Sequence, residues 1–277
     1  MSAKAGAAAA LPRLERTGRV TQLRVVLSEW TKLHSLRSSR WSLLVAGLLT
    51  VGFPLLFATI LSNRWSHLSP RERAHRDPLD VALSGVNVAQ LAIGVLGVLL
   101  ISGEYSTGMI RSTFVAVPKR LPVLWAKASV YGAITLALTV PAVLIGFFGS
   151  QAILRNHHIL ELSFSHPGVA RTVLGGAVYL TLVGVFALGL GAILRNTAGG
   201  IATFAAIMFV IPPLLNILPS DWNNAINPYL PSTAGNAIFS LTHGSDTLAP
   251  WPGFALFCGY TALSLGIAAL LLVRRDT

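Results

Sequence analysis

The sequence predicts an all-α integral membrane protein, and three observations support this fold class. Of the 277 residues, 53% are hydrophobic and only 11% are charged, whereas soluble chains carry about 25% charged residues. The apolar residues come in blocks of roughly 20, the length of one helical span. The chain has 21 Lys and Arg against 10 Asp and Glu, and most of these lie between the blocks. A soluble enzyme is thereby excluded, and the single cysteine, Cys258, excludes an internal disulfide scaffold.

Six segments qualify as transmembrane helices, at about 41–61, 81–103, 129–150, 169–194, 197–218 and 251–273. Only Arg195 and Asn196 separate the fourth from the fifth, which predicts a tight helical hairpin. The pair Pro212-Pro213 predicts that the fifth helix ends early and that residues 214–240 partly re-enter the membrane. Residues 21–277 thus form one transmembrane domain, and the composition of residues 1–20 predicts a disordered start.

The distribution of Lys and Arg predicts the orientation of the helices. Fifteen of the 21 lie on the side that holds both termini, and six lie on the other side. Cytoplasmic loops carry the excess of Lys and Arg in membrane proteins. We therefore expect a multi-pass protein of the bacterial cell (plasma) membrane with the N and C termini in the cytoplasm. The same rule accounts for the net charge of +11, so no nucleic-acid partner is expected.

Residues 21–38 precede the first span and have the pattern of an amphipathic helix. Charged residues lie between apolar residues that recur at three- and four-residue intervals, namely Leu23, Val26, Leu27, Trp30, Leu33 and Leu36. This pattern predicts an interfacial helix along the inner membrane surface, in contact with lipid through Trp30 and Leu33 and with Lys32 on its polar side. An ordinary solvated helix is the alternative.

The polar segments contain no recognisable catalytic motif. The Gly-x-x-x-x-Gly-Lys phosphate loop is absent, and so is the His-Glu-x-x-His zinc motif. Five of the seven histidines lie in the outer loops, but their spacing matches no ligand set. We expect a chain that is not an enzyme and that binds no metal or cofactor itself.

The inner segment between the second and third spans is too apolar for a plain linker. Met109, Ile110, Phe114 and Val117 would form one face of a short helix that stops near Pro118. An exposed apolar face of this kind usually marks contact with a partner.

Three motifs give the chain a family resemblance. They are Ser28-Glu29-Trp30-Thr31-Lys32-Leu33, Gly103-Glu104-Tyr105-Ser106-Thr107-Gly108-Met109-Ile110-Arg111 and Tyr229-Leu230-Pro231-Ser232. With them, the chain resembles ABC type-2 transporter permeases, in the version typical of actinobacteria. The resemblance implies the ABC type-2 exporter fold, pairing with a second permease subunit as a homodimer or heterodimer, and two copies of a separate ABC ATPase subunit. ATP and Mg²⁺ would be bound by that ATPase.

The resemblance also implies roles for particular residues. The helix over residues 21–38 would be the connecting helix, and residues 104–119 would be a coupling helix seated in a groove of the ATPase. The apolar anchors would be Met109, Ile110 and Phe114. Tyr105 belongs to the same segment, where Glu104 and Arg111 would fix the register through charge. A helix-end ion pair facing water is the alternative for those two charges.

Ser84, Asn87 and Gln90 form a polar stripe on one face of the second span. Polar groups at membrane depth face protein or a water-filled cavity, not lipid. The stripe therefore predicts either a cavity wall that touches substrate or a set of hydrogen bonds between helices.

Together these features favour the permease subunit of an ATP-driven ABC exporter. Because no span has a charge at its centre, the expected cargo is amphipathic or hydrophobic, such as an antibiotic, a drug or a lipid-like molecule. That places the chain among candidates for multidrug efflux and antibiotic resistance. The alternative is a non-transporting membrane anchor or sensor for an ABC ATPase. A proton- or sodium-coupled carrier would need an ionisable group inside a span.

Overall fold

The computed structural model describes residues 21–35, 37–74, 77–110, 120–157, 159, 162–217, 219–241 and 247–274. These residues form helices, turns and connecting segments, and none of them forms a strand. Six of the helical stretches are long and apolar enough to cross a membrane. The all-helical class and the six membrane-compatible helices are therefore confirmed. The predicted disordered start at residues 1–20 lies outside the described residues.

Most of the long helices extend beyond the predicted spans. The described α-helices, short ones included, are in chain order α1 Gln22–Ser35, α2 Arg37–Arg64, α3 Pro70–Ala74, α4 Pro78–Ser106, α6 Leu121–Asn156, α7 Val169–Leu194, α8 Thr197–Ala205, α9 Ile211–Leu215, α10 Ser220–Ile226, α11 Pro231–Asn236 and α12 Pro250–Arg274. The largest difference is at the third span, predicted at 129–150 and observed over α6. The hydropathy pattern ends where polar residues begin, whereas the backbone hydrogen-bond ladder continues through them.

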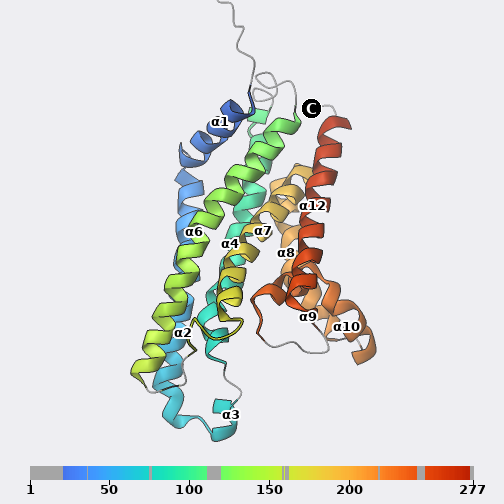
Figure 1. Ribbon diagram of the computed structural model, residues 1–277. Helices are drawn as coiled ribbons and strands as arrows, with labels where there is room; N and C mark the ends of the chain where they lie inside the picture. Colours follow the sequence, from blue (N-terminus) through green and yellow to red (C-terminus); the bar gives the residue numbers. More distant parts are fainter. Residues whose placement is uncertain are drawn as a thin grey trace, which may run out of the picture.

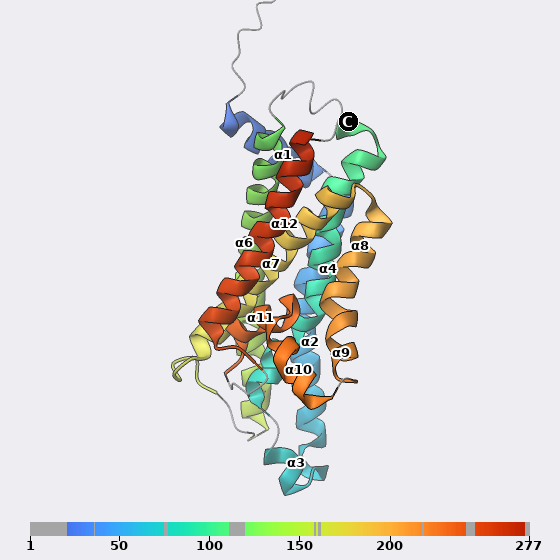
Figure 2. The same ribbon diagram turned by 90° about the vertical axis from the view of Figure 1, so that its right-hand side faces the viewer.

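Five long helices run side by side along the molecule: α2, α4, α6, α7 and α12 (Figure 1). Helix α7 lies at the centre, in contact with α4, α6 and α12. The short helix α1 lies at one end of the bundle, together with the C-terminal end of α12, and we call this the α1 end. Figure 2 shows α3 and α10 at the opposite end.

The predicted hairpin between the fourth and fifth spans is present. Arg195 has a left-handed backbone, with φ of 51°, which turns the chain directly after α7. Asn196 then caps α8 by accepting a hydrogen bond from the Gly199 backbone N–H at 2.8 Å. Two residues thus suffice to reverse the chain at the α1 end.

The two central helices touch through their backbones. A Cβ atom added to Gly97 of α4 would overlap the carbonyl oxygen of Gly184 in α7, so a larger residue cannot stand there without moving a helix. Small residues permit this close approach between membrane helices.

Hydrogen bonds from neutral side chains join the same helices at mid-span. The Tyr179 hydroxyl of α7 donates to Gln90 Oε1 of α4 at 2.5 Å, and the Tyr131 hydroxyl of α6 donates to the carbonyl of Ile93 at 2.6 Å. All three polar side chains are buried. The middle of the bundle is therefore held by neutral polar groups.

The segment after the fifth span returns along the bundle. Its 3₁₀ turn at Ala237–Phe239 packs against α7, where the Phe239 and Tyr179 rings lie 5.0 Å apart. Tyr179 is ten residues into α7, which corresponds to about 15 Å along the helix axis. The segment therefore packs against the bundle near the level of Tyr179, and its predicted re-entry into the membrane stays a prediction.

The paired prolines do not break the fifth span where they stand. A π-helical turn at Ala206–Val210 precedes them, and they occupy the first turn of α9. The first turn of a helix tolerates proline because its N–H groups have no intrahelical partner. The helical path continues to Leu215, slightly short of the predicted end at 218.

We expect the variant Gly97→Ala to be less stable than the native chain, because the added methyl group meets the Gly184 backbone. Overpacking of this kind costs about 1–3 kcal/mol, a fall in Tm of roughly 3–10 °C. The matched control is Gly266→Ala in α12, where an added Cβ meets no atom within 4 Å. Thermal unfolding of the purified chain in detergent measures both. Equal Tm values would contradict the backbone contact.

Candidate functional site

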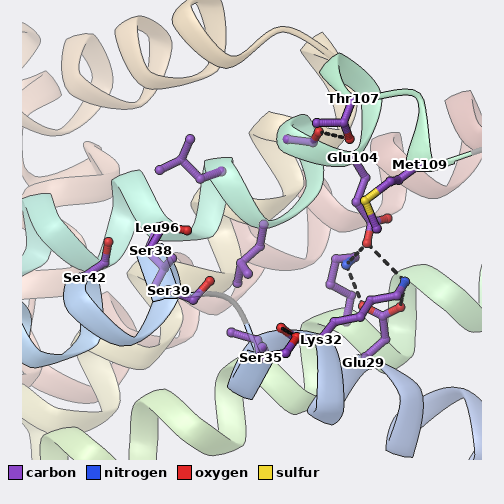
Figure 3. Close-up of a pocket in the computed structure, with 15 residues that line it drawn as sticks. Glu29, Lys32, Ser35, Ser38, Ser39, Ser42, Leu96, Glu104, Thr107 and Met109 are labelled. Carbon is purple, nitrogen blue, oxygen red and sulfur yellow. Dashed lines mark hydrogen bonds and ion pairs between the residues drawn. The ribbon is translucent and has the colours of Figure 1, made fainter.

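Four charged side chains meet in a closed ring at the α1 end. Lys32 Nζ lies 2.6 Å from Glu29 Oε1 and 3.2 Å from Glu104 Oε1. Lys127 Nζ lies 2.6 Å from Glu29 Oε2 and 3.0 Å from Glu104 Oε1. Each ammonium group therefore binds both carboxylates, and each carboxylate binds both ammonium groups. We call these four residues the charge ring, and Figure 3 shows the side chains of Glu29, Lys32 and Glu104 converging.

The charge ring joins three helices that are far apart in sequence. Glu29 and Lys32 belong to α1, Glu104 to the last turns of α4, and Lys127 to the beginning of α6. Glu29, Lys127 and Glu104 are only 2%, 3% and 9% exposed. Removing such charges from water costs several kcal/mol per ion unless opposite charges compensate for it. The equal number of positive and negative groups supplies that compensation.

The ring shifts the pKa values of the two α1 residues. Burial by itself would raise the pKa of Glu29, but the neighbouring Lys127 and Lys32 ammonium groups outweigh it, and the pKa lies below its usual value. Burial would likewise lower the pKa of Lys32, whereas hydrogen bonds and attraction to Glu29 and Glu104 raise it above its usual value. Both groups are therefore ionised at neutral pH.

Helix α1 has two apolar faces rather than the single one that the sequence predicts. Val25 and Leu33 face the bundle and lie on either side of Glu29, whereas Leu27 and Trp30 are exposed on the outer side. Lys32 is half-buried in the charge ring and does not belong to a solvated face. The prediction that Trp30 and Leu33 share one apolar face is thus wrong. The spacing of charges cannot show that Glu29 finds two lysines from inside the bundle.

The predicted coupling helix over residues 104–119 is wrong in its first part. Glu104 and Tyr105 belong to the last turn of α4, which ends at Ser106. Gly108 has a φ of 73°, so the helix that holds Glu104 does not continue through Gly108. Met109 is 50% exposed, whereas Ile110 is buried. Two further predicted residues of this segment, Arg111 and Phe114, lie outside the described residues.

The polar stripe of the second span does not form one surface. Ser84 donates a hydrogen bond to the carbonyl of Val81 in its own helix at 2.8 Å, and Asn87 is exposed. Gln90 is buried and accepts the hydrogen bond from Tyr179. The structure thus supports the helix-to-helix interpretation at Gln90, and none of the three residues lines the cavity beside the charge ring.

That cavity lies beside the charge ring and has a volume of about 380 Å³. All four ring residues line it, and Figure 3 shows Glu29, Lys32 and Glu104 at one end, together with Thr107 and Met109. The remaining walls combine hydroxyl groups from the beginning of α2 with leucines of α4, namely Ser38, Ser39, Ser42, Leu96, Leu99 and Leu100. The cavity is therefore charged at one end and mainly apolar along α4.

Two arginines connect α12 to the same end of the bundle. Arg120 Nη1 donates to the carbonyl of Leu272 at 3.1 Å, and Arg195 Nη2 donates to that of Leu271 at 3.3 Å. The Arg195 guanidinium also lies 5.0 Å above the ring of Tyr105 in α4. Cationic groups at the C-terminus of a helix satisfy its last carbonyls and oppose its dipole. The α1 end is thus cross-linked by polar contacts on both sides of α4.

Metal-ligand candidates do not gather in the described part of the chain, where no three His, Cys, Asp or Glu side chains cluster. Comparison with known proteins adds no assignment, since no protein-family model and no curated protein matches this chain.

We expect Lys127→Ala to cost about 3–5 kcal/mol of unfolding free energy, because it leaves two buried carboxylates facing one remaining lysine. The double variant Glu29→Gln/Lys127→Met removes one charge of each sign and should cost less than Lys127→Ala. Arg155→Ala is the control, because Arg155 is an exposed cation on the same helix. Reversible unfolding in mixed detergent micelles measures all three. An equal loss for Lys127→Ala and the control would show that the ring contributes nothing.

We expect α1 to remain docked between about pH 5 and pH 10. Because the pKa of Glu29 is lowered, its contribution is complete above the usual value of about 4.3 and is lost only as pH falls through the lower folded value. Because the pKa of Lys32 is raised, its contribution is complete below about 10.4 and is lost as pH rises through the higher folded value.

Spin labels at Ser28→Cys in α1 and Ser129→Cys in α6, in a Cys258→Ala background, report this docking as a distance distribution, because both serines are exposed. A label pair placed within α6 alone is the control. Undocking between pH 5 and pH 7 would mean that the pKa of Glu29 is raised.

Proposed function

We propose that this chain is the permease subunit of an ATP-driven ABC exporter in the bacterial cell membrane, with its termini in the cytoplasm. It pairs with a second permease subunit and moves an amphipathic or hydrophobic compound outward. A separate ABC ATPase, present in two copies, binds ATP and Mg²⁺ and supplies the energy. The six apolar helices and the three sequence motifs support this assignment.

The charge ring is the observation that carries the proposal. An exporter driven by a separate ATPase needs a mechanical connection between its cytoplasmic surface and its spans. The ring joins the surface helix α1 to the ends of two spans, α4 and α6, through buried ion pairs. Separating buried opposite charges costs several kcal/mol, so a push on any of the three elements displaces them together.

The segment after α4 is where such a push would be applied. It begins at Met109, whose side chain is half exposed and only five residues after Glu104 of the ring. An exposed apolar side chain beside a rigid charged cluster is a suitable anchor for a partner protein.

The remaining surface fits the proposed assembly. The first and fifth apolar helices are the least buried of the six, with 22% and 17% of their most apolar windows buried within the chain. These faces supply apolar surface for a second permease subunit and for lipid. The groups described above at mid-span, Gln90, Tyr131 and Tyr179, are neutral, which favours cargo without a strong charge.

We expect Met109→Asp to reduce the amount of ATPase that copurifies with the tagged chain by at least tenfold, because a carboxylate replaces an apolar anchor. Phe114→Asp, chosen from the sequence alone, should have the same effect. The control is Ile217→Asp, which changes an exposed apolar residue between α9 and α10. Quantitative mass spectrometry of the detergent-solubilised complex gives the stoichiometry.

The same eluate distinguishes an exporter from an anchor or sensor. Stimulation of its ATPase activity by one class of amphipathic compound supports transport. An ATPase that copurifies but responds to no compound in the panel favours the anchor. Normal copurification with both Asp variants would contradict the coupling contact.

A further inference from the structure

The first two turns of α2 form a hollow that combines positive charge with apolar surface. The hollow has a volume of about 310 Å³ and is lined by Arg37, Arg40, Trp41 and Leu44. The last three follow the first by three, four and seven residues, so all four lie on one face of the helix. All four side chains are exposed. The hollow is therefore open to the surroundings of the bundle.

The two arginines of the hollow differ from the other arginines at the helix ends. Arg120, Arg171 and Arg195 each donate to backbone carbonyls of another segment. Among the described residues, neither Arg37 nor Arg40 has a hydrogen-bond or ion-pair partner. The first turn of α2 also contains no acidic residue. Two neighbouring guanidinium groups favour an anionic ligand, and phosphate suits them because each can bind two of its oxygens.

Tryptophans place the hollow at one edge of the hydrocarbon layer. Trp41 is 63% exposed, and Trp30 and Trp125 are exposed at the same end of the bundle. Trp65 directly follows α2, 24 residues after Trp41, which corresponds to about 36 Å along a helix. The hydrocarbon core of a membrane is about 30 Å thick, and tryptophan is enriched at both of its edges. This spacing puts Trp41 at the level of the lipid head groups.

The order of side chains along this face of α2 matches the order of groups in a phospholipid. Arg37 lies about 6 Å from Trp41 along the helix axis, on the side away from the hydrocarbon. Leu44 and Leu48 are exposed and follow Trp41 in the opposite direction. A phospholipid likewise presents a phosphate, then a glycerol region, then acyl chains. A free phosphate ion would leave the apolar part of the face uncovered.

We propose that Arg37 and Arg40 bind the phosphate of an anionic phospholipid in the leaflet at the α1 end. Its glycerol region packs on Trp41, and an acyl chain lies along Leu44 and Leu48. A choline or ethanolamine head group would bring a third cation beside the two arginines, so the site selects lipids with a net negative charge. The site goes beyond the export function proposed above and needs no ATPase.

The chain offers a matched pair of variants for the test. Arg37→Gln/Arg40→Gln removes the two cations of the hollow and keeps polar side chains in their place. The control, Arg64→Gln/Arg155→Gln, removes two exposed arginines from the other ends of α2 and α6, so both variants have the same net charge. Because all four arginines are exposed, neither variant is expected to alter the fold. The Tm of each in detergent checks this.

The test compares two lipids that share their acyl chains, dioleoylphosphatidylglycerol and dioleoylphosphatidylcholine. Each is titrated into the full-length purified chain in neutral detergent, and native mass spectrometry gives the Kd of the first bound lipid. We expect phosphatidylglycerol to bind at least tenfold more tightly than phosphatidylcholine. Arg37→Gln/Arg40→Gln should weaken the binding of phosphatidylglycerol at least tenfold, and the control should leave it within twofold.

Four results would overturn the proposal. Equal affinity for the two lipids would show that the head-group charge is not recognised, and equal losses in the two variants would show only a general effect of net charge. Displacement of phosphatidylglycerol by inorganic phosphate would assign the arginines to a free anion. A native dimer that becomes monomeric in Arg37→Gln/Arg40→Gln would assign this face of α2 to a second copy of the chain.

Discussion

The structure depends on four charged side chains that are removed from water together and paired with one another. Each of these side chains alone would be destabilised by a large desolvation penalty at the edge of the bundle. They are Glu29, Lys32, Glu104 and Lys127. As a closed ring they compensate one another, and together with the buried Val25 and Leu33 they fix α1 against α4 and α6. Two isolated ion pairs would connect fewer of the three helices, so one helix could move away from the others.

The distribution of polar groups along the bundle follows from the same cost. At mid-span the helices are joined by neutral donors and acceptors, such as Tyr179 with Gln90, and by glycine contacts such as Gly97 with Gly184. Among the described residues, the ring and the two arginines that contact the last carbonyls of α12 lie at the α1 end, and Arg171 at the start of α7 donates to the carbonyls of Ile238 and Ser240. Long-range contacts of charged side chains therefore lie toward the ends of the helices, while neutral groups join their middle.

The sequence was sufficient for the fold class because hydrophobic block length is a local property. The six spans and the hairpin at Arg195 and Asn196 follow from it, whereas the functional site does not. The sequence pattern makes Glu29 a solvated charge between apolar residues and Lys127 a loop charge, because their contact with each other joins residues 98 positions apart in the chain. The one local signal that could have corrected residues 104–119 is Gly108, whose left-handed backbone ends α4 after Glu104.

The position of Glu104 links the cavity to the mechanics of the ring. One of its oxygens holds both lysines, the other is buried with no donor among the described residues, and the residue lines the cavity. Because Lys32 and Lys127 share Oε1, a shift of the Glu104 side chain changes both contacts at once. Glu104 is therefore the residue through which α4 restrains both α1 and α6, so the part of the cavity wall that Glu104 forms moves with the ring.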